Sequence, residues 1–333
     1  MTSALLRAYR LRLKRRHLLW RSLRARHDLR PVADRTAGLG RDAILAFLCV
    51  RNEALRLPYL LSYYRRLGVT HFLVVDNESD DGTEDLLSAQ PDVSLWRATG
   101  SYRASRFGMT WIGWLLMRHG HGRWCLTVDA DELLVFPHQD RGLRALTERM
   151  DQQGQPALPA LMVELYPKGR ISGAVCPPGE DPVGVIPWFD ADGYQTRWQP
   201  EVAACRTIGG PRARVFFQDM PDRAPTLDKL PLVRWHWRYA FDTSTHRILP
   251  RRLARQDAAS VTAVLLHTKF LSDAVPRAAM EKQRGQHFNT PLAYDGYYDA
   301  LAADPDLWTD SSRRYEGWQQ LEALGLMSRG AWV

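Results

Sequence analysis

The sequence lacks any apolar stretch long enough to cross a membrane, and it has few cysteines. No apolar run in the 333 residues approaches the ~18 that a bilayer-spanning helix needs, so membrane contact, if any, should be peripheral. No two cysteines form a C-x-x-C pair, and most lie in or near apolar, strand-like runs. We therefore expect free thiols, a reducing compartment and no structural zinc. The cysteines are Cys49, Cys125, Cys176 and Cys205.

No internal repeat or low-complexity tract is present, and the composition is that of a globular protein. Hydrophobic residues make up 45% of the chain and charged residues 25%, which excludes a mainly disordered, collagen-like or fibrous chain. The length allows one large domain or two smaller ones with a substantial core.

Acidic side chains are almost missing from the N-terminus, and this explains the net charge of +8. Residues 1–30 contain ten basic side chains and one acid, Asp28, whereas the remaining 303 residues hold 35 basic and 36 acidic groups. The whole excess of positive charge therefore belongs to an N-terminal arm, and the body of the chain is nearly neutral.

The basic arm has a rough helical stripe of apolar residues, interrupted by Arg16. Such a helix suits an anionic membrane surface, and a solvated, frayed arm explains the pattern equally well. Nucleic acid ranks third, because no basic continuation or aromatic stacking platform follows. We expect no secretory signal, since no apolar core interrupts the arginines, whereas a mitochondrial transit peptide shares this composition. The expected location is the cytoplasm, at the inner face of the membrane if the arm binds there. The stripe consists of Leu6, Tyr9, Leu13, Trp20 and Leu23.

The order of apolar runs predicts an α/β protein. We expect an arm and linker over residues 1–41 and one continuous domain over 42–333, with halves 42–153 and 154–333. Continuous apolar runs between helical patterns indicate buried parallel strands with flanking helices. The predicted strands are 43–50, 71–75, 93–97, 123–128, 232–241 and 261–271. The predicted helices are 53–67, 83–89, 105–118, 141–152, 277–303 and 311–324.

The strongest chemical signal is an acidic sequence at the carboxyl end of a predicted strand. Asp129 and Asp131 are two residues apart, so in extended chain they point to the same side. Two carboxylates at a strand end favour Mg²⁺ or Mn²⁺, and ligands of open α/β sheets bind at this edge. An acidic turn or helix cap is the alternative explanation, and the motif alone does not decide between them.

Two further polar loops follow predicted strands. Asp76 ends one strand and opens the loop 76–83, in which a carboxylate can accept hydrogen bonds from a base or a ribose. Taken alone, that loop is explained by turn-forming residues. Residues 50–53 follow the first strand of the domain. Three polar loops at one sheet edge are harder to explain as turns alone.

At residues 47–83, FLCVRNEALRLPYLLSYYRRLGVTHFLVVDNESDDGT, and 126–134, LTVDADELL, the chain resembles glycosyltransferase family 2, which has the GT-A fold. The resemblance covers about residues 43–137, and it is thinner beyond 140. It implies a Rossmann-like, mainly parallel sheet flanked by helices. It also implies transfer of a sugar, with inversion, from a nucleotide-sugar such as a UDP- or GDP-sugar. The implied acceptor is a glycan, a lipid-linked molecule or another hydroxyl compound, as in polysaccharide synthesis.

The resemblance also implies roles for residues of the first half. Asp129-Ala130-Asp131 matches the family's D-x-D motif, in which Asp131 would bind a Mn²⁺ or Mg²⁺ ion and Asp129 the metal or the ribose. Asp76, followed by Asn77, matches the acid that contacts the nucleotide base. Arg106 stands where the family often has Ala-Arg-Asn near the sugar nucleotide, but Phe107 replaces the Asn here. The nucleoside pocket would be lined by Val50, Arg51, Asn52 and Glu53.

The second half offers a further metal ligand and a base. His267 and Lys269 share a face of the predicted strand; the resemblance implies that His267 completes the metal site and that Lys269 reaches the phosphates. A half-buried structural histidine is an equal alternative. An acceptor hydroxyl needs a general base, for which we favour Asp190 and Glu164. Lesser candidates are Asp192 and Asp219 as bases, Arg212 and Arg214 for an acceptor phosphate, Trp188 and Trp198 for sugar stacking, and His236.

Two other functions compete with the glycosyltransferase. A nucleotidyltransferase uses a similar sheet, but it usually has a Gly-rich phosphate loop after the first strand, and VRNEALRL (50–57) has no glycine. An inactive GT-A scaffold acting as a membrane-associated binding protein is the other, and the intact D-x-D motif argues against it.

Overall fold

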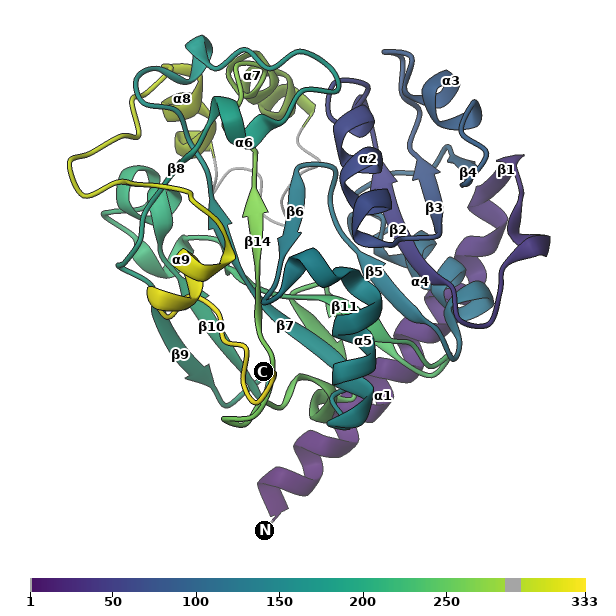
Figure 1. Ribbon diagram of the computed structural model, residues 1–333. Helices are drawn as coiled ribbons and strands as arrows, with labels where there is room; N and C mark the ends of the chain where they lie inside the picture. The colour runs from purple at the N-terminus through teal and green to yellow at the C-terminus, as the bar shows by residue number, and fades with distance from the viewer. Residues whose placement is uncertain (1, 285–294) are drawn as a thin grey trace.

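The computed structural model describes residues 2–284 and 295–333, and a single mixed sheet organises them (Figure 1). The strand order is β1-β4-β3-β2-β5-β11-β7-β14-β6. Six of these nine strands run in one direction, and β1, β6 and β11 run in the other. The strands are β1 (Leu29–Ala33), β2 (Ile44–Val50), β3 (His71–Asp76), β4 (Val93–Ala98), β5 (Trp124–Thr127), β6 (Glu132–Val135), β7 (Ala157–Glu164), β11 (Asp228–Arg234) and β14 (Ala263–His267).

Helices cover both faces of the sheet, which explains the continuous apolar runs of its strands. In β2, Ile44, Ala46 and Leu48 join a core on one face, and Leu45 and Phe47 join a core on the other. The first core is covered by α2 (Leu57–Leu67) and α5 (Gly142–Gln152), and the second by α1 (Thr2–Ala25) and α4 (Met109–Leu115). The predicted mixed, mainly parallel, Rossmann-like α/β class is thus confirmed.

Smaller elements complete the described part of the chain. Three two-stranded sheets pair β8 with β15, β9 with β10, and β12 with β13. No helix in residues 2–284 or 295–333 is both long and apolar enough to cross a membrane. The elements are α3 (Thr83–Ser88), α6 (Pro182–Val185), β8 (Trp188–Phe189), β9 (Gln195–Gln199), β10 (Ala204–Ile208), β12 (Ala240–Thr243), β13 (Arg247–Leu249), α7 (Ala274–Arg284), α8 (Asp295–Ala302), β15 (Arg313–Arg314) and α9 (Trp318–Ala323).

The N-terminal arm is helical as predicted, but its second half is integrated into the fold. Leu18, Ser22 and Ala25 are buried, and α1 packs along α4. The end of the expected arm and linker is also structured, because residues up to Ala33 belong to β1, which pairs antiparallel with β4. A side chain at Gly113 of α4 would lie 3.2 Å from the Cβ of Ser22, so the two helices approach closely there.

Several predicted boundaries are wrong, each for a local reason. The helix expected from 105 begins at Met109, because Arg106, Phe107 and Gly108 all have positive φ. The helix expected over 311–324 begins after Gly317, whose φ is 127°. The strand expected over 261–271 ends at His267, because the next residue, Thr268, donates its N–H to the Asp131 carbonyl oxygen of another loop.

The remaining differences concern helix starts and one divided strand. The helix expected from 53 begins at Leu57, with Pro58 in its first turn. The strand expected over 232–241 is divided into β11 and β12 by a turn. Helix 277–303 corresponds to α7 and α8, and its middle, 285–294, lies outside the described residues.

We expect the α1–α4 contact to contribute to stability through Gly113. Gly113→Ala should lower the free energy of unfolding by about 1–3 kcal/mol through overpacking against Ser22, despite the higher helix propensity of alanine. In a Ser22→Gly background the same change should be neutral or stabilising. Urea unfolding of the four proteins measures this coupling. Gly184→Ala is the control, since nothing lies within 4 Å of a Cβ there; equal losses in both backgrounds would contradict the packing.

His119, which lies 6.0 Å from the ring of Trp96, should make stability depend on pH. Burial, assisted by Arg118, lowers the pKa of His119 to about 4. Below about pH 6.5 the histidine of the unfolded chain binds a proton, whereas that of the folded chain stays neutral until about pH 4. The free energy of unfolding is therefore highest above pH 6.5 and falls as the pH drops toward 4. Because the ring is partly exposed, we expect a loss of about 1–2 kcal/mol. His119→Gln should remove this loss in urea titrations at pH 7 and pH 4.5, whereas His27→Gln should not.

Candidate functional site

Polar residues converge at the edge where the six co-directional strands end. Val50, Asp76, Glu164 and His267 are the last residues of β2, β3, β7 and β14. The antiparallel strands β6 and β11 begin at this same edge, so their first residues join the group, and the loop 128–131 after β5 lies there too. In an open α/β sheet such an edge is where ligands bind.

The two polar loops after β2 and β3 are joined by hydrogen bonds. The Asn52 amide nitrogen donates to Asp80 Oδ1 at 2.7 Å, and the Asn52 backbone N–H donates to Ser79 Oγ at 2.9 Å. The backbone N–H of Glu53 donates to Thr83 Oγ1 at 3.0 Å. The two sequence motifs therefore form one structural unit, which explains why each is rich in small polar residues.

Asp76 is buried at the base of this unit. Burial raises the pKa of Asp76, while hydrogen bonds from Ser79 oppose that rise. Neighbouring Asn77 is also buried, and its amide donates to the carbonyl oxygen of Ala98 at 2.9 Å. The Arg51 guanidinium donates to the Asn77 carbonyl oxygen at 3.0 Å. Asn77 thus ties β3 to the end of β4, and Asp76 is tied to the joined loops by the hydrogen bonds from Ser79.

Glu53 and Arg56 connect this unit to α7. Arg56 donates to both carboxylate oxygens of Asp273 at 2.8 Å, and Arg277 donates to Glu53 at 2.7 Å. Burial raises the pKa of Glu53, although Arg56 and Arg277 oppose the rise. These contacts give Glu53 an anchoring role in addition to any contact with a nucleoside.

The two aspartates of the acidic motif point to different partners, contrary to the prediction for extended chain. They lie in a turn closed by the Glu132 N–H and the Asp129 carbonyl oxygen at 3.2 Å. The Asp129 side chain is 59% exposed and lies 3.3 Å from Lys229 Nζ, whereas Asp131 is 24% exposed and lies 3.1 Å from His267 Nε2. The turn is held to β14 by Thr268, whose N–H donates to the Asp131 carbonyl oxygen at 2.7 Å.

Lys229 is the site residue that the sequence analysis missed. It lies near the start of β11, its side chain is 3% exposed, and Nζ lies 2.7 Å from Glu132 Oε1. Burial raises the pKa of Glu132, and the positive charge of Lys229 opposes that rise. Burial would lower the pKa of Lys229, but Glu132 and Asp129 raise it above its usual value. A lysine in a mainly apolar strand was the available signal, and it lies about a hundred residues from its partners in sequence.

His267 joins the acidic turn to Glu164. Its Nδ1 lies 3.5 Å from Glu164 Oε1, and Glu164 also forms an ion pair with the buried Arg212. Burial by itself would lower the pKa of His267, but Asp131 raises it above the usual value. Burial would raise the pKa of Asp131, but His267 holds it below its usual value. Burial would likewise raise the pKa of Glu164, but Arg212 and His267 hold it below its usual value. Asp131, His267, Glu164 and Arg212 thus form one chain of alternating charge, which is buried except at Asp131.

The other predicted site residues have separate partners. Asp190 accepts two hydrogen bonds of 3.0 Å from Arg214 and one from Tyr166, and is not bonded to the acidic turn. Arg106 donates to the carbonyl oxygens of Phe241 and Asp242, so its guanidinium is directed to β12.

Lys269 lies close enough to the acidic turn to help lower the pKa of Asp131, and its Nζ lies 5.4 Å from the centre of the Tyr297 ring. Ala130 is buried between the two aspartates of the turn. The structure therefore places Lys269 and Ala130 beside the acidic turn.

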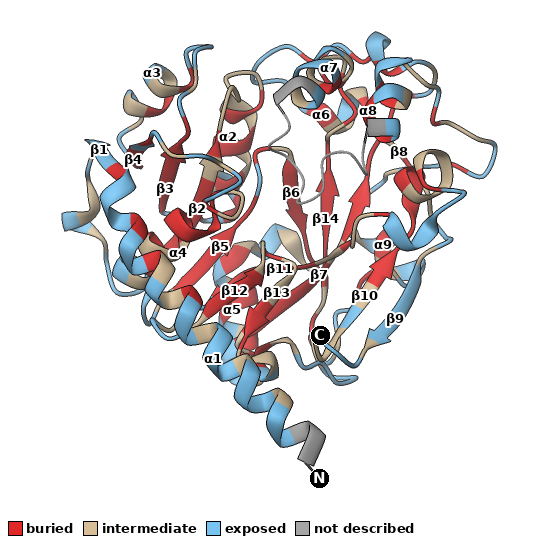
Figure 2. Ribbon diagram, turned by 180° about the vertical axis from the view of Figure 1, so that it is seen from behind, coloured by how far each residue is buried: buried red, intermediate tan, exposed pale blue. Residues whose placement is uncertain are grey.

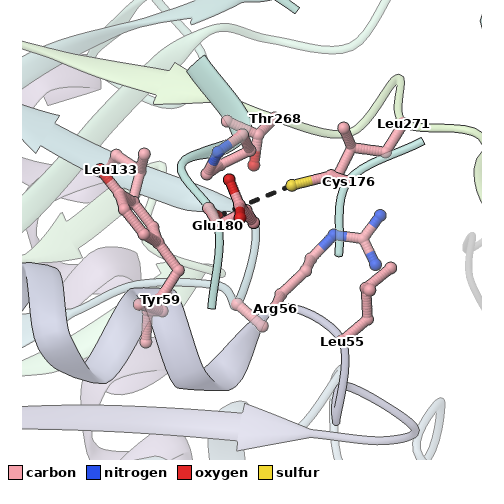
Figure 3. A pocket seen from close by; sticks show the side chains of 11 residues that line it. Leu55, Arg56, Tyr59, Leu133, Cys176, Glu180, Thr268 and Leu271 are labelled. Atoms are coloured by element: carbon pink, nitrogen blue, oxygen red, sulfur yellow. Dashed lines mark hydrogen bonds between the residues drawn. The ribbon is translucent and has the colours of Figure 1, made fainter. Parts of the chain in front are cut away.

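A small pocket lies behind the acidic turn (Figure 3). Its wall is largely apolar, with Arg56 and Glu180 at its margin, and Cys176 Sγ lies 3.6 Å from the Glu180 carbonyl oxygen. None of the edge carboxylates lines it, but Ala130 and Thr268 do, so it adjoins the acidic turn. The lining residues are Leu55, Arg56, Tyr59, Leu60, Ala130, Leu133, Cys176, Glu180, Pro182, Thr268 and Leu271.

The donor atoms of the edge suit a hard divalent cation. Carboxylate oxygens of Asp129 and Asp131 and an imidazole nitrogen of His267 are ligands that Mn²⁺ and Mg²⁺ accept. Within the described ranges, no three acidic, histidine or cysteine side chains are already arranged around one point. Because the Asp129 side chain is 59% exposed, a change of its rotamer toward Asp131 would not disturb the core.

No protein-family model and no curated protein matches the chain. Among solved structures, it is similar to a putative glucose-1-phosphate thymidylyltransferase from Bacillus anthracis in complex with a sucrose, with 8% identity and a TM-score of 0.27 over 38% of this chain and 56% of that one. It is also similar to a 4-diphosphocytidyl-2C-methyl-D-erythritol synthase, with 20% identity and a TM-score of 0.26 over 38% of this chain and 64% of that one. A UDP-glucose pyrophosphorylase from Acinetobacter baumanii is similar with 11% identity and a TM-score of 0.31 over 78% of this chain and 99% of that one. The chain thus spans less than two thirds of the first two, and TM-scores of this size do not assign it to any of these families.

Lys229 should be essential to stability because it neutralises a buried carboxylate. Lys229→Met leaves Glu132 charged and buried without its partner, so we expect the free energy of unfolding to fall by about 3–5 kcal/mol. The double variant with Glu132→Gln should recover most of that loss. Guanidinium unfolding measures both, with Lys168→Met on the surface as the control. A double variant as unstable as the single one would contradict the pairing.

Proposed function

We propose that this protein is a metal-dependent glycosyltransferase that uses a nucleotide-sugar donor. The observation that carries the proposal is the convergence of Asp76, the acidic turn and His267 at one carboxyl edge. The resemblance to glycosyltransferase family 2 requires an acid for the base, a D-x-D motif and a late histidine in this order along the chain, and separate strands bring these residues to the same edge.

In this proposal the edge divides the donor between two groups of residues. The joined loops after β2 and β3 offer the Asp76 carboxylate for a base or a ribose. Asp129, Asp131 and His267 would hold a Mn²⁺ or Mg²⁺ ion, which supplies positive charge for the departing diphosphate. Lys269 adds a cation beside Asp131, suited to a phosphate oxygen.

The reaction needs a base for the acceptor hydroxyl. The acceptor oxygen would form a bond to the anomeric carbon, the bond from that carbon to the diphosphate would break, and the hydroxyl proton would pass to a carboxylate. Glu164 lies next to His267 but is fully buried and paired with Arg212, whereas the Asp190 side chain is 12% exposed and paired with Arg214. Both stay proposed bases, and Asp190 is the more accessible of the two.

A nucleotidyltransferase is the competing function, and the same polar edge would serve it. Such an enzyme binds a nucleoside triphosphate and releases pyrophosphate. The loop after β2 holds no glycine, and its backbone N–H groups at Asn52, Glu53 and Ala54 are occupied by Ser79, Thr83 and Asp81. With these donors engaged, the loop is poorly suited to cradle a triphosphate, which favours the glycosyltransferase.

The proposal predicts metal-dependent binding of a nucleotide-sugar through Asp131. In a thermal-shift screen of UDP- and GDP-sugars, at least one donor should raise the melting temperature with Mn²⁺ and lose its effect with a chelator. Asp131→Asn should abolish that shift and lower the release of nucleoside diphosphate by about a hundredfold or more. Asp310→Asn, an identical change at an exposed position, should behave as wild type.

The same samples test the alternatives. Release of pyrophosphate from a nucleoside triphosphate, with no nucleoside diphosphate released from any sugar donor, would establish the nucleotidyltransferase instead. Binding of a donor without turnover in any acceptor mixture, and without an effect of Mn²⁺, would favour the inactive scaffold.

A further inference from the structure

The outer side of α1 carries a row of large apolar side chains that no part of the described chain covers. With 3.6 residues per turn, these residues fall within about a third of the helix circumference. Leu18 and Ser22, which contact the body, lie on the opposite side. The helix is therefore apolar on two faces, and only one of them is explained by the fold. The outward residues are Leu5, Leu6, Tyr9, Leu13, Trp20 and Leu23, which are 38–67% exposed.

Basic side chains flank this row. Helix α1 contains eight arginines and lysines and no acid. Among the residues with described contacts, only Lys14 of these eight has a carboxylate partner, Asp242. Arg12 borders the apolar row, Arg16 interrupts it, and the Arg24 guanidinium lies 4.9 Å above the Trp20 ring. Figure 2 shows this outer side exposed along most of the helix, whose N-terminal end extends beyond the body.

The body of the protein adds to the same flank. Arg15 has a lowered pKa, caused first by burial and then by the nearby positive charges of Arg12, Arg252 and Arg238. Arg238 comes from the turn between β11 and β12 and lies 4.6 Å from the ring of Trp237, which is 42% exposed. Three segments distant in sequence thus gather like charges beside exposed aromatic rings, an arrangement that costs free energy unless an anionic partner is bound.

The combination of features selects the partner. A nucleic acid would use the basic groups, but it would leave the apolar row in water. A second copy of the chain would cover the row, but it would bring two strongly basic helices together. An anionic bilayer accepts both, because leucine and tryptophan enter the boundary of the acyl chains while arginines reach the lipid phosphates.

We propose that the outer face of α1, together with the Trp237–Arg238 turn, is a docking surface for an anionic lipid bilayer. Helix α1 lies over one face of the sheet, away from the carboxyl ends of its parallel strands (Figures 1 and 2). Docking therefore leaves the candidate site open. The proposal does not depend on the function of that site.

Co-sedimentation with vesicles tests the surface in the full-length chain. The protein should bind vesicles of phosphatidylcholine mixed with phosphatidylglycerol, bind pure phosphatidylcholine weakly, and lose binding between about 0.1 M and about 1 M salt. Leu13→Ser should lower the partition coefficient by about tenfold. The matched control is Leu324→Ser, since Leu324 is exposed to a similar extent on the other half of the chain, 39% against 44%.

A charge variant separates general electrostatics from the surface itself. Arg12→Gln, Arg16→Gln and Arg24→Gln together should lower the partition coefficient by about a hundredfold. The variant with Arg141→Gln, Arg313→Gln and Arg314→Gln loses the same net charge from exposed positions elsewhere and should keep most of the binding. Circular dichroism and the melting temperature should be unchanged in every variant, because each altered side chain is exposed.

Four outcomes would overturn the proposal. They are no binding to anionic vesicles at low salt, equal binding to both kinds of vesicle, equal effects of the variants and their matched controls, and binding of duplex DNA that depends on the three arginines while vesicles are ignored. Dimerisation that Leu13→Ser abolishes, without vesicle binding, would assign the row to a contact between copies of the chain.

Discussion

The burial of charge at the carboxyl edge of the sheet is the constraint on which the candidate site depends. Glu132, Glu164 and Lys229 are each almost completely removed from water, and no such group can remain charged without a partner of opposite sign. The partners come from other strands: β11 provides Lys229 for β6, and β14 provides His267 for β7. The order of strands in the sheet and the pairing of these charges are therefore one arrangement, and neither is stable without the other.

This constraint divides the carboxylates of the polar edge into buried ones and ones in contact with solvent. Glu132 and Glu164 are fixed by Lys229 and by Arg212, and they hold the acidic turn and His267 in place. Asp129 is mostly exposed, and Asp131 remains in partial contact with solvent. Asp129 and Asp131 are thus the more accessible carboxylates of this group, and each contacts a buried residue, Lys229 for the first and His267 for the second. The cation proposed for this edge would require a change of the Asp129 rotamer, and such a change would leave the sheet in place.

The sequence predicts the central strands well because each is a continuous apolar run covered by helices on both faces. The acidic turn, Asp76 and His267 are found at the edge for the same reason, since each follows such a run. Lys229 and the pairing of Arg212 with Glu164 escape prediction, because the partners are distant in sequence and nothing local in the chain indicates these contacts. The different directions of Asp129 and Asp131 are also missed, because a turn replaces the extended chain on which the expectation was based.

The N-terminal arm shows the opposite error, in which a correct helix was given too much independence. The excess positive charge of the sequence lies entirely in this arm, and that suggested a separate segment. Yet Ser22 packs against Gly113 and β1 adds an edge strand, so removing residues 1–30 would uncover α4 and the edge of β4. A truncation therefore confuses loss of folding with loss of binding. Only substitutions on the outer face of α1 can separate the two, because that face contributes nothing to the packed core.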